Sequence, residues 1–408
     1  MQTLNFKLFF QTAIFSMLIV GASWGTWLLI QLCKAQEFTK LNIFEVNAHG
    51  QAQIFGWIGM MIIGALYAAL PRLFSAPIPY PVLMRPTWAF LLIGTAISIF
   101  GLLFREMNML VLLGGVLNLI AVLFVIVQLT VFFSRIQERG PAVLYSLTAL
   151  TFLGLSTAYS LWHHVKLVQA KDQIELLGQV ATFQAPLRDL QVHGMGLFMV
   201  LAMMQWIFFH PCRSISYKAY AWLISGVAGE VFFFLLYRFT HNHLFAAFLI
   251  LPWSCLLIGS FLLFFRGRLM SHLPPLARLA VGWLFLSEAM LVFLPFNSLL
   301  SHISFSHAYY GAIRHAVTVG FLSQMIFIMA PRLLTGYFPA ITFQKKLAFF
   351  LLNIGCLARV SLQVLSDYYP ETYRFIFLSG LLELSATLLW GLQAICYIRS
   401  SSIVPTKL

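Results

Sequence analysis

Twelve apolar runs, each long enough to cross a lipid bilayer, constrain this chain more than any other feature of its sequence. A helix needs ~20 mostly apolar residues to span the hydrocarbon core. The sequence therefore predicts an all-α, polytopic membrane protein with twelve transmembrane helices in a single integral membrane domain over residues 1–408. The runs cover residues 8–33, 47–71, 86–104, 109–134, 141–161, 189–210, 216–237, 243–265, 276–299, 307–331, 344–366 and 371–398.

Little of the chain suits a water-exposed surface. Only 9% of its residues are charged, whereas a soluble domain carries about 25%, so most of the surface must face the lipid bilayer. The stretch from His163 to Arg188 is the exception, because it is polar enough to predict an extramembrane loop. The first run exceeds the ~7–15 apolar residues of a cleavable signal peptide, so we expect it to be retained as the first helix.

The charges are divided unevenly between the two ends of the predicted helices. With the N-terminus in the cytoplasm, 15 of the 25 Lys and Arg residues fall in inner loops and tails, and eight of the 12 acids fall outside. The positive-inside rule then predicts that both termini are cytoplasmic. The basic residues lie singly between apolar runs, which excludes a nucleic-acid-binding surface. The five cysteines form no C-x-x-C pair and fit small apolar helix positions.

Nine of the eleven histidines fall at the outer ends of the predicted helices or in outer loops. His49, His193 and His315 begin the second, sixth and tenth runs. Each of these runs ends at a proline with an arginine nearby: Pro71 with Arg72, Pro211 with Arg213, and Pro331 with Arg332. Because the pattern recurs at every fourth run, it predicts three pseudo-repeats, at about 1–140, 141–275 and 276–408. The alternative is coincidence, since His and Pro are common at helix ends.

A layer of histidines inside lipid points to metal or haem ligation, because an isolated polar side chain there is costly and imidazole ligates iron and copper. On the second run Gln53 lies one turn below His49, and Gly56 and Gly64 continue the same face. Small residues on this face would leave room for a porphyrin. The alternative is that the glycines allow close helix packing.

Two segments resemble a known family. "RHAVTVGFLSQMIFIMAPRLL", from Arg314, resembles the tenth-helix signature of the NnrS family of bacterial membrane proteins. "NAHGQAQIFGWIGMMIIGALYAALPRL", from Asn47, is similar to the second helix of that family and of haem-copper oxidase catalytic subunits. The resemblance implies haem b with His49 and His315 as axial ligands, and His193 at the position of a copper ligand. It also implies a role in the response to nitric oxide or its detoxification, in the bacterial inner membrane.

Further candidates follow from position. His241 and His243, just after the seventh run, are candidate copper ligands beside His193. Four charged residues fall inside runs, where they predict either a proton path or structural ion pairs: Glu230, Glu288, Arg359 and Glu383. The resemblance implies nitric oxide as a gaseous ligand, with oxidoreductase activity on it as one outcome, and a membrane electron donor as a partner. The competing functions are a proton-coupled secondary transporter without a cofactor and a non-catalytic electron-transfer or assembly subunit.

Overall fold

The protein is described here by a computed structural model, which covers residues 2–37, 40–104, 107–137, 140–209, 216–266, 269–303, 306–335 and 342–400. Within these ranges the chain forms helices and no strand. Twelve helical spans of 23 to 36 residues are long and apolar enough to cross a membrane. The prediction of an all-α, polytopic membrane protein is therefore confirmed.

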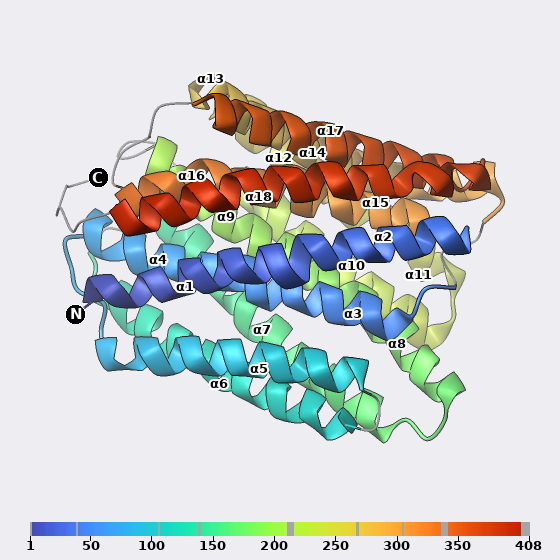
Figure 1. The fold of residues 1–408 in the computed structure, drawn as a ribbon, viewed down its shortest axis with the longest axis horizontal. Helices are drawn as coiled ribbons and strands as arrows, with labels where there is room; N and C mark the ends of the chain where they lie inside the picture. Colours follow the sequence, from blue (N-terminus) through green and yellow to red (C-terminus); the bar gives the residue numbers. More distant parts are fainter. Residues whose placement is uncertain are drawn as a thin grey trace. The chain divides into compact units, whose positions relative to one another are not determined.

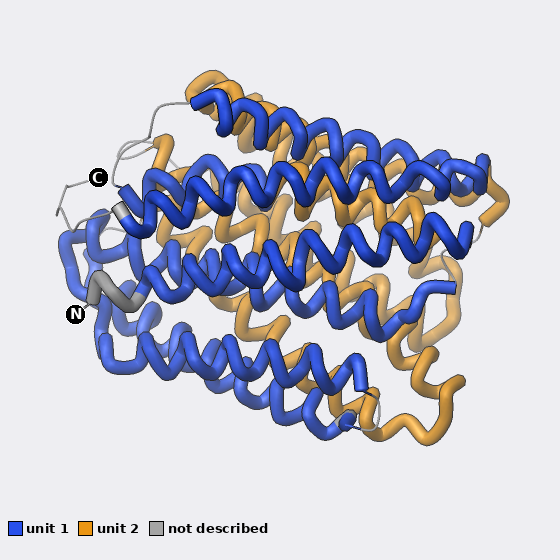
Figure 2. Tube along the Cα trace, viewed as in Figure 1, with its two compact units in different colours: residues 1–138, 323–408 blue, residues 139–322 orange. Residues whose placement is uncertain are grey.

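The chain divides into two compact units (Figure 2). Unit 1 comprises residues 1–138 and 323–408, and unit 2 comprises residues 139–322. The second division falls inside the tenth span, His307–Thr335.

Unit 1 contains the first four and the last two complete spans (Figure 1). Its helices are α1 (Gln2–Ser16), η1 (Met17–Ala22), α2 (Ser23–Ala35), α3 (Ile43–Gln51), η3 (Ala52–Gly59), α4 (Met60–Leu73), η4 (Pro81–Leu83), α5 (Met84–Leu103), α6 (Asn108–Ser134), α16 (Gln324–Thr335), α17 (Phe343–Leu365), η9 (Pro370–Phe375) and α18 (Ile376–Ser400).

Unit 2 contains the fifth to ninth spans and the first part of the tenth, up to residue 322. Its helices are α7 (Pro141–Gln169), α8 (Gln173–Asp189), η6 (Leu190–Leu197), α9 (Phe198–Phe208), α10 (Tyr217–Thr240), α11 (His243–Phe248), α12 (Ile250–Phe261), η7 (Leu262–Arg266), α13 (Leu269–His272), α14 (Pro275–Ser301), α15 (His307–His315) and η8 (Ala316–Ser323), whose last residue belongs to unit 1.

Three helical hairpins form the most extensive helix contacts, and they recur at every fourth span. These are α5 with α6 and α17 with α18 in unit 1, and α10 with α12 in unit 2. Glycines permit the close approach. A Cβ atom added to Gly226 on α10 would lie 2.7 Å from Leu256, and one added to Gly259 on α12 would lie 2.8 Å from Leu223. The three pseudo-repeats stay a prediction.

The prediction of an extramembrane loop from His163 to Arg188 is wrong, because this stretch is almost entirely helical. Helix α7 continues to Gln169, and α8 begins at Gln173. Asp172 caps α8 by accepting a hydrogen bond from the Glu175 backbone N–H at 2.8 Å. Glu175 in turn accepts one from the Lys171 backbone N–H at 2.9 Å. An acid followed three residues later by Glu is a helix-start pattern, and it outweighs the polarity of the segment.

The second, sixth and tenth spans are the most buried of those described. In the most apolar part of each span, 94% of the residues are buried in the second and sixth spans and 78% in the tenth. In the other spans the share is at most 61%. Each of the three also contains a π-helical segment close to its histidine. These segments are η3, η6 and η8; two more, η1 and η7, lie in the first and eighth spans. A π-helical turn widens the helix and is frequent at functional sites.

The proline–arginine ends of the second, sixth and tenth spans are only partly described. Arg72 donates a hydrogen bond to the backbone oxygen of Leu333, which ties the ends of α4 and α16 together. Pro211 and Arg213, which complete the pattern in the sixth span, lie outside the described residues.

Candidate functional site

His193 lies in η6, within the most buried part of unit 2. Its side chain is only 3% exposed. In the π-helical turn, the backbone oxygen of Gln191 lies close to Gly196, five residues later. A Cβ atom added to Gly196 would lie 3.4 Å from that oxygen, so a small residue suits position 196. The imidazole of His193 is therefore buried inside the protein. A buried polar side chain is costly unless it forms a hydrogen bond.

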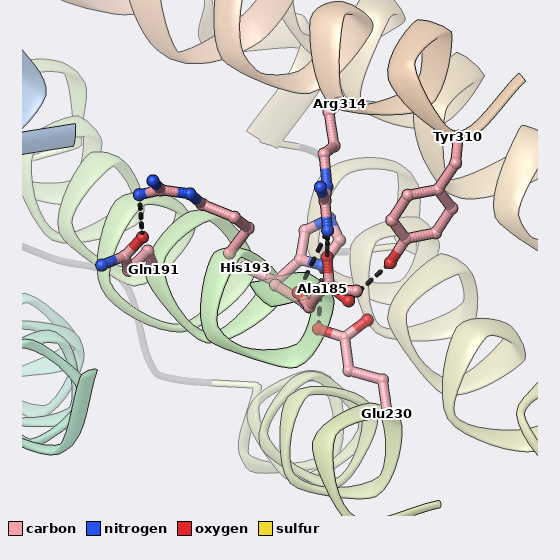
Figure 3. Close-up of polar contacts among 8 residues, drawn as sticks. Ala185, Gln191, His193, Glu230, Tyr310 and Arg314 are labelled. Carbon is pink, nitrogen blue, oxygen red and sulfur yellow. Dashed lines mark hydrogen bonds and ion pairs between the residues drawn. The ribbon is translucent and has the colours of Figure 1, made fainter. Parts of the chain in front are cut away.

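Glu230 on α10 is that partner (Figure 3). The Nδ1 atom of His193 and the Oε1 atom of Glu230 lie 2.8 Å apart, and Glu230 is 2% exposed. An ionised carboxylate only accepts hydrogen bonds, so it places the imidazole proton on Nδ1 and leaves a lone pair on Nε2. Within the described part of the chain, the buried Nε2 atom has no hydrogen-bond partner. Metal-ligating histidines show this arrangement, with one nitrogen held by a carboxylate and the other free for the metal.

One turn before His193, Asp189 joins the sixth span to Tyr310 and Arg314 of the tenth, which are labelled in Figure 3. Its Oδ2 atom accepts a hydrogen bond from the Tyr310 hydroxyl at 2.5 Å, and its Oδ1 atom lies 3.3 Å from Nη2 of Arg314. Arg314 also donates to the Ala185 carbonyl at 3.0 Å and lies over the Tyr310 ring at 4.4 Å. Sequence analysis missed this group, although the four-residue spacings of 189 with 193 and 310 with 314 place each pair on one helix face.

Glu288 lies at the middle of α14 and is fully buried. Its Oε1 atom accepts a hydrogen bond from the Ser260 hydroxyl at 2.6 Å. It also interacts electrostatically with His193 and Glu230. Two of the acids expected inside helices therefore lie in one polar region of unit 2 with His193.

In unit 1, the face of the second span that carries His49 is covered by the first span. A Cβ atom added to Gly25 would lie 3.1 Å from the His49 ring, and one added to Gly21 would lie 3.0 Å from the Gln53 amide. A Cβ atom added to Gly56 would collide with the Ser16 side chain, and one added to Gly64 would lie 2.9 Å from the Phe9 side chain. The glycines thus serve close helix packing, and this face does not fit the flat side of a porphyrin.

His315 ends α15 in unit 2 and is half-buried. His241 and His243 are exposed. His241 caps α10 in a left-handed conformation with φ of 54°, and His243 begins α11. Glu230, which contacts His193, precedes His241 by 11 residues on one helix. His241 and His243 are therefore displaced from His193 by about 16 Å along that helix. A metal ion on His241 and His243 would therefore occupy a separate, surface site.

The other two intramembrane charges lie in unit 1. Arg359 on α17 interacts electrostatically with Glu383 on the packed helix α18. This interaction agrees with the structural alternative, in which Arg359 is balanced by an acid on a neighbouring helix.

A scan of the sequence against models of known protein families finds no match, and a search of the curated proteins finds no similar sequence.

Proposed function

We propose that this protein is a membrane-bound metalloprotein of the NnrS type in which His193 ligates a transition metal. The observation that carries the proposal is the His193–Glu230 contact of 2.8 Å, together with the buried Nε2 atom of His193, which has no hydrogen-bond partner in the described ranges. A neutral imidazole in a dry, membrane-spanning interior offers a strong ligand for haem iron or copper.

The residues around His193 support a ligand role in defined ways. Glu230 fixes the tautomer and the orientation of the ring, which raises the basicity of the ligating nitrogen. Asp189, one helical turn away, anchors the same segment to α15. When bound, haem iron or copper would supply a coordination position for a small gaseous ligand, and the NnrS resemblance identifies nitric oxide as the candidate.

The haem b site with His49 and His315 as axial ligands remains a further proposal. It rests on the resemblance, because the glycine face beside His49 is filled by the first span. The role in nitric-oxide response or detoxification, the oxidoreductase activity, the membrane electron donor and the bacterial inner-membrane location rest on the resemblance as well.

A second candidate function is a proton-coupled transporter without a cofactor. It is favoured by the buried carboxylates Glu230 and Glu288, each of which has one oxygen without a hydrogen-bond partner among the described residues. Such acids in a membrane interior are typical of proton relays.

The test is metal analysis and visible spectroscopy of the protein purified in detergent without chelators. We expect a bound transition metal or haem in the wild type and its loss in His193→Ala. The matched controls His241→Ala and His243→Ala should keep the metal, because those side chains are exposed and distant from His193. A colourless, metal-free wild type would reject the metalloprotein and favour the transporter.

A further inference from the structure

Basic side chains gather at one end of unit 1, where the first, eleventh and twelfth spans meet, and the metal proposal does not use them. Helix α18 packs against both α1 and α17. The Lys7 ammonium on α1 donates to the Ile398 carbonyl on α18 at 3.0 Å. The Lys345 ammonium on α17 lies over the Tyr397 ring on α18, 5.3 Å from the ring centroid. Arg399 follows within two residues of that ring, so these contacts bring three cations to one end of the unit.

Two of the basic side chains at this end are turned outward. Lys346, next to Lys345, is exposed, and so is Arg399. Neither side chain forms a hydrogen bond or an ion pair with another described residue. By contrast, the Arg278 guanidinium at the start of α14 donates to the backbone oxygens of Leu273 and Ser271, at 2.8 and 3.2 Å. Lys346 and Arg399 therefore do not serve as caps of the fold.

The chain segments that form this end contain no acidic side chain. Residues 1–36, 331–366 and 384–408 include neither Asp nor Glu. The nearest acid along α18, Glu383, lies 16 residues before Arg399, which is about 24 Å of helix. The acidic side chains of these helices therefore do not offset the positive charge here.

Apolar side chains continue from the basic ones along both helices. Phe350 lies one turn after Lys346 on α17 and is 60% exposed, and Leu392 lies two turns before Arg399 on α18 and is 61% exposed. Residues four or seven apart share one face of a helix. Both basic residues lie at the end of a membrane span, so each helix presents a charge at the depth of the lipid headgroups and an apolar face deeper in the bilayer.

We propose that Lys345, Lys346 and Arg399 bind the headgroup of an anionic phospholipid, whose acyl chains lie along α17 and α18. The basic side chains complement the negative headgroup, and the exposed faces of Phe350 and Leu392 contact the chains. A free small anion matches only the charged part of this surface. The positive-inside rule predicts that this end is cytoplasmic, and the cytoplasmic leaflet carries the anionic lipids that attract clustered Lys and Arg.

The experiment titrates the purified full-length protein in a nonionic detergent with dioleoylphosphatidylglycerol, which is anionic, or with zwitterionic dioleoylphosphatidylcholine. Native mass spectrometry counts the bound lipid. We expect the wild type to bind the anionic lipid more tightly. Lys346→Gln and Arg399→Gln should each weaken binding of the anionic lipid about fivefold, the usual effect of removing one basic side chain near an anionic membrane surface.

The matched control is Lys34→Gln. The Lys34 ammonium lies over the Trp27 ring, 5.9 Å from its centroid, much as Lys345 lies over Tyr397. Lys34 belongs to the other end of the first span, so its variant should bind the anionic lipid like the wild type. The proposal is rejected if the wild type does not distinguish the two lipids, or if Lys34→Gln weakens binding as much as the other two variants.

A second arm separates a lipid headgroup from a free anion. Inorganic phosphate is added to the lipid-bound protein, with sodium chloride at the same ionic strength as the control for screening. The two salts should release the same amount of lipid. Release by phosphate alone would identify a site for a free anion and would overturn the lipid proposal. No step of the test uses His193 or a metal, so its outcome is independent of the proposed metal centre.

Discussion

At the scale of single residues, the contact between His193 and Glu230 decides which imidazole nitrogen is available to a metal. Replacing Glu230 by Gln keeps the size of the side chain but removes the charge that holds the Nδ1 proton. We expect Glu230→Gln to lower metal affinity about 10- to 100-fold, the usual effect of losing such a partner. The measurement is the metal content of protein dialysed against graded concentrations of a competing chelator.

Glu288→Gln is the control for this prediction. Glu288 is equally buried, but it accepts its hydrogen bond from Ser260 and not from the imidazole. Its variant should retain the metal. Equal loss in the two variants would mean that general polarity of the region, and not orientation of His193, governs metal binding.

Also at this scale, Asp189 balances Arg314 inside unit 2. We expect Asp189→Asn to destabilise the protein by about 3 kcal/mol, the lower end for breaking a buried ion pair, because the Arg314 side chain is 29% exposed. Thermal unfolding in detergent measures the effect. Tyr310→Phe should cost more than Tyr309→Phe, since Tyr310 donates to a carboxylate and Tyr309 to the Met290 backbone carbonyl at 3.2 Å. The reverse order would contradict the role given to Asp189.

At the scale of elements, glycines set how closely the paired helices approach. A Cβ atom on Gly114 of α6 would lie 2.5 Å from the Gly94 carbonyl oxygen and 2.7 Å from the Ser98 backbone nitrogen on α5. Backbone atoms cannot rotate away, so Gly114→Ala should separate the helices and cost about 1–3 kcal/mol, the usual effect of overpacking. Thermal unfolding again provides the measurement.

Gly282→Ala provides the comparison for the helix pair. Among the described residues, no atom outside the helix's own backbone lies within 4 Å of a Cβ position on Gly282 in α14. Alanine should be neutral there, or stabilising by about 0.5–1 kcal/mol, because it restricts the unfolded chain and favours the helix. If both alanine variants unfold at the same temperature, contact between α5 and α6 is not what requires Gly114.

At the scale of the whole molecule, the even number of spans and the contact between the terminal helices place both chain ends together. The Lys7 ammonium donates to the Ile398 carbonyl at 3.0 Å, and both residues belong to unit 1. The positive-inside rule predicts that this side is cytoplasmic. We expect a reporter that works only in the cytoplasm to be active when it is fused after Leu408. The same reporter inserted after Ala170, between α7 and α8, should be inactive; the opposite pair of results would invert the topology.

The sequence by itself determined the membrane class and the twelve spans. Those properties depend on local apolar run length and on charge bias, which need no knowledge of neighbouring helices. Local reading erred between His163 and Arg188, where overall polarity concealed the Asp172–Glu175 helix start.

Only the tertiary structure decided what surrounds each histidine. His49 and His193 look alike in sequence, yet Gly25 of a neighbouring helix packs against the first, and Glu230, 37 residues away, holds the second. The histidines at 241 and 243, close to Glu230 in the chain, lie a long stretch of helix away from His193. Which side chains contact one another inside a helical bundle depends on how each helix is rotated about its axis. π-helical turns change that rotation, and neither the rotation nor the turns can be predicted from the pattern of residue types.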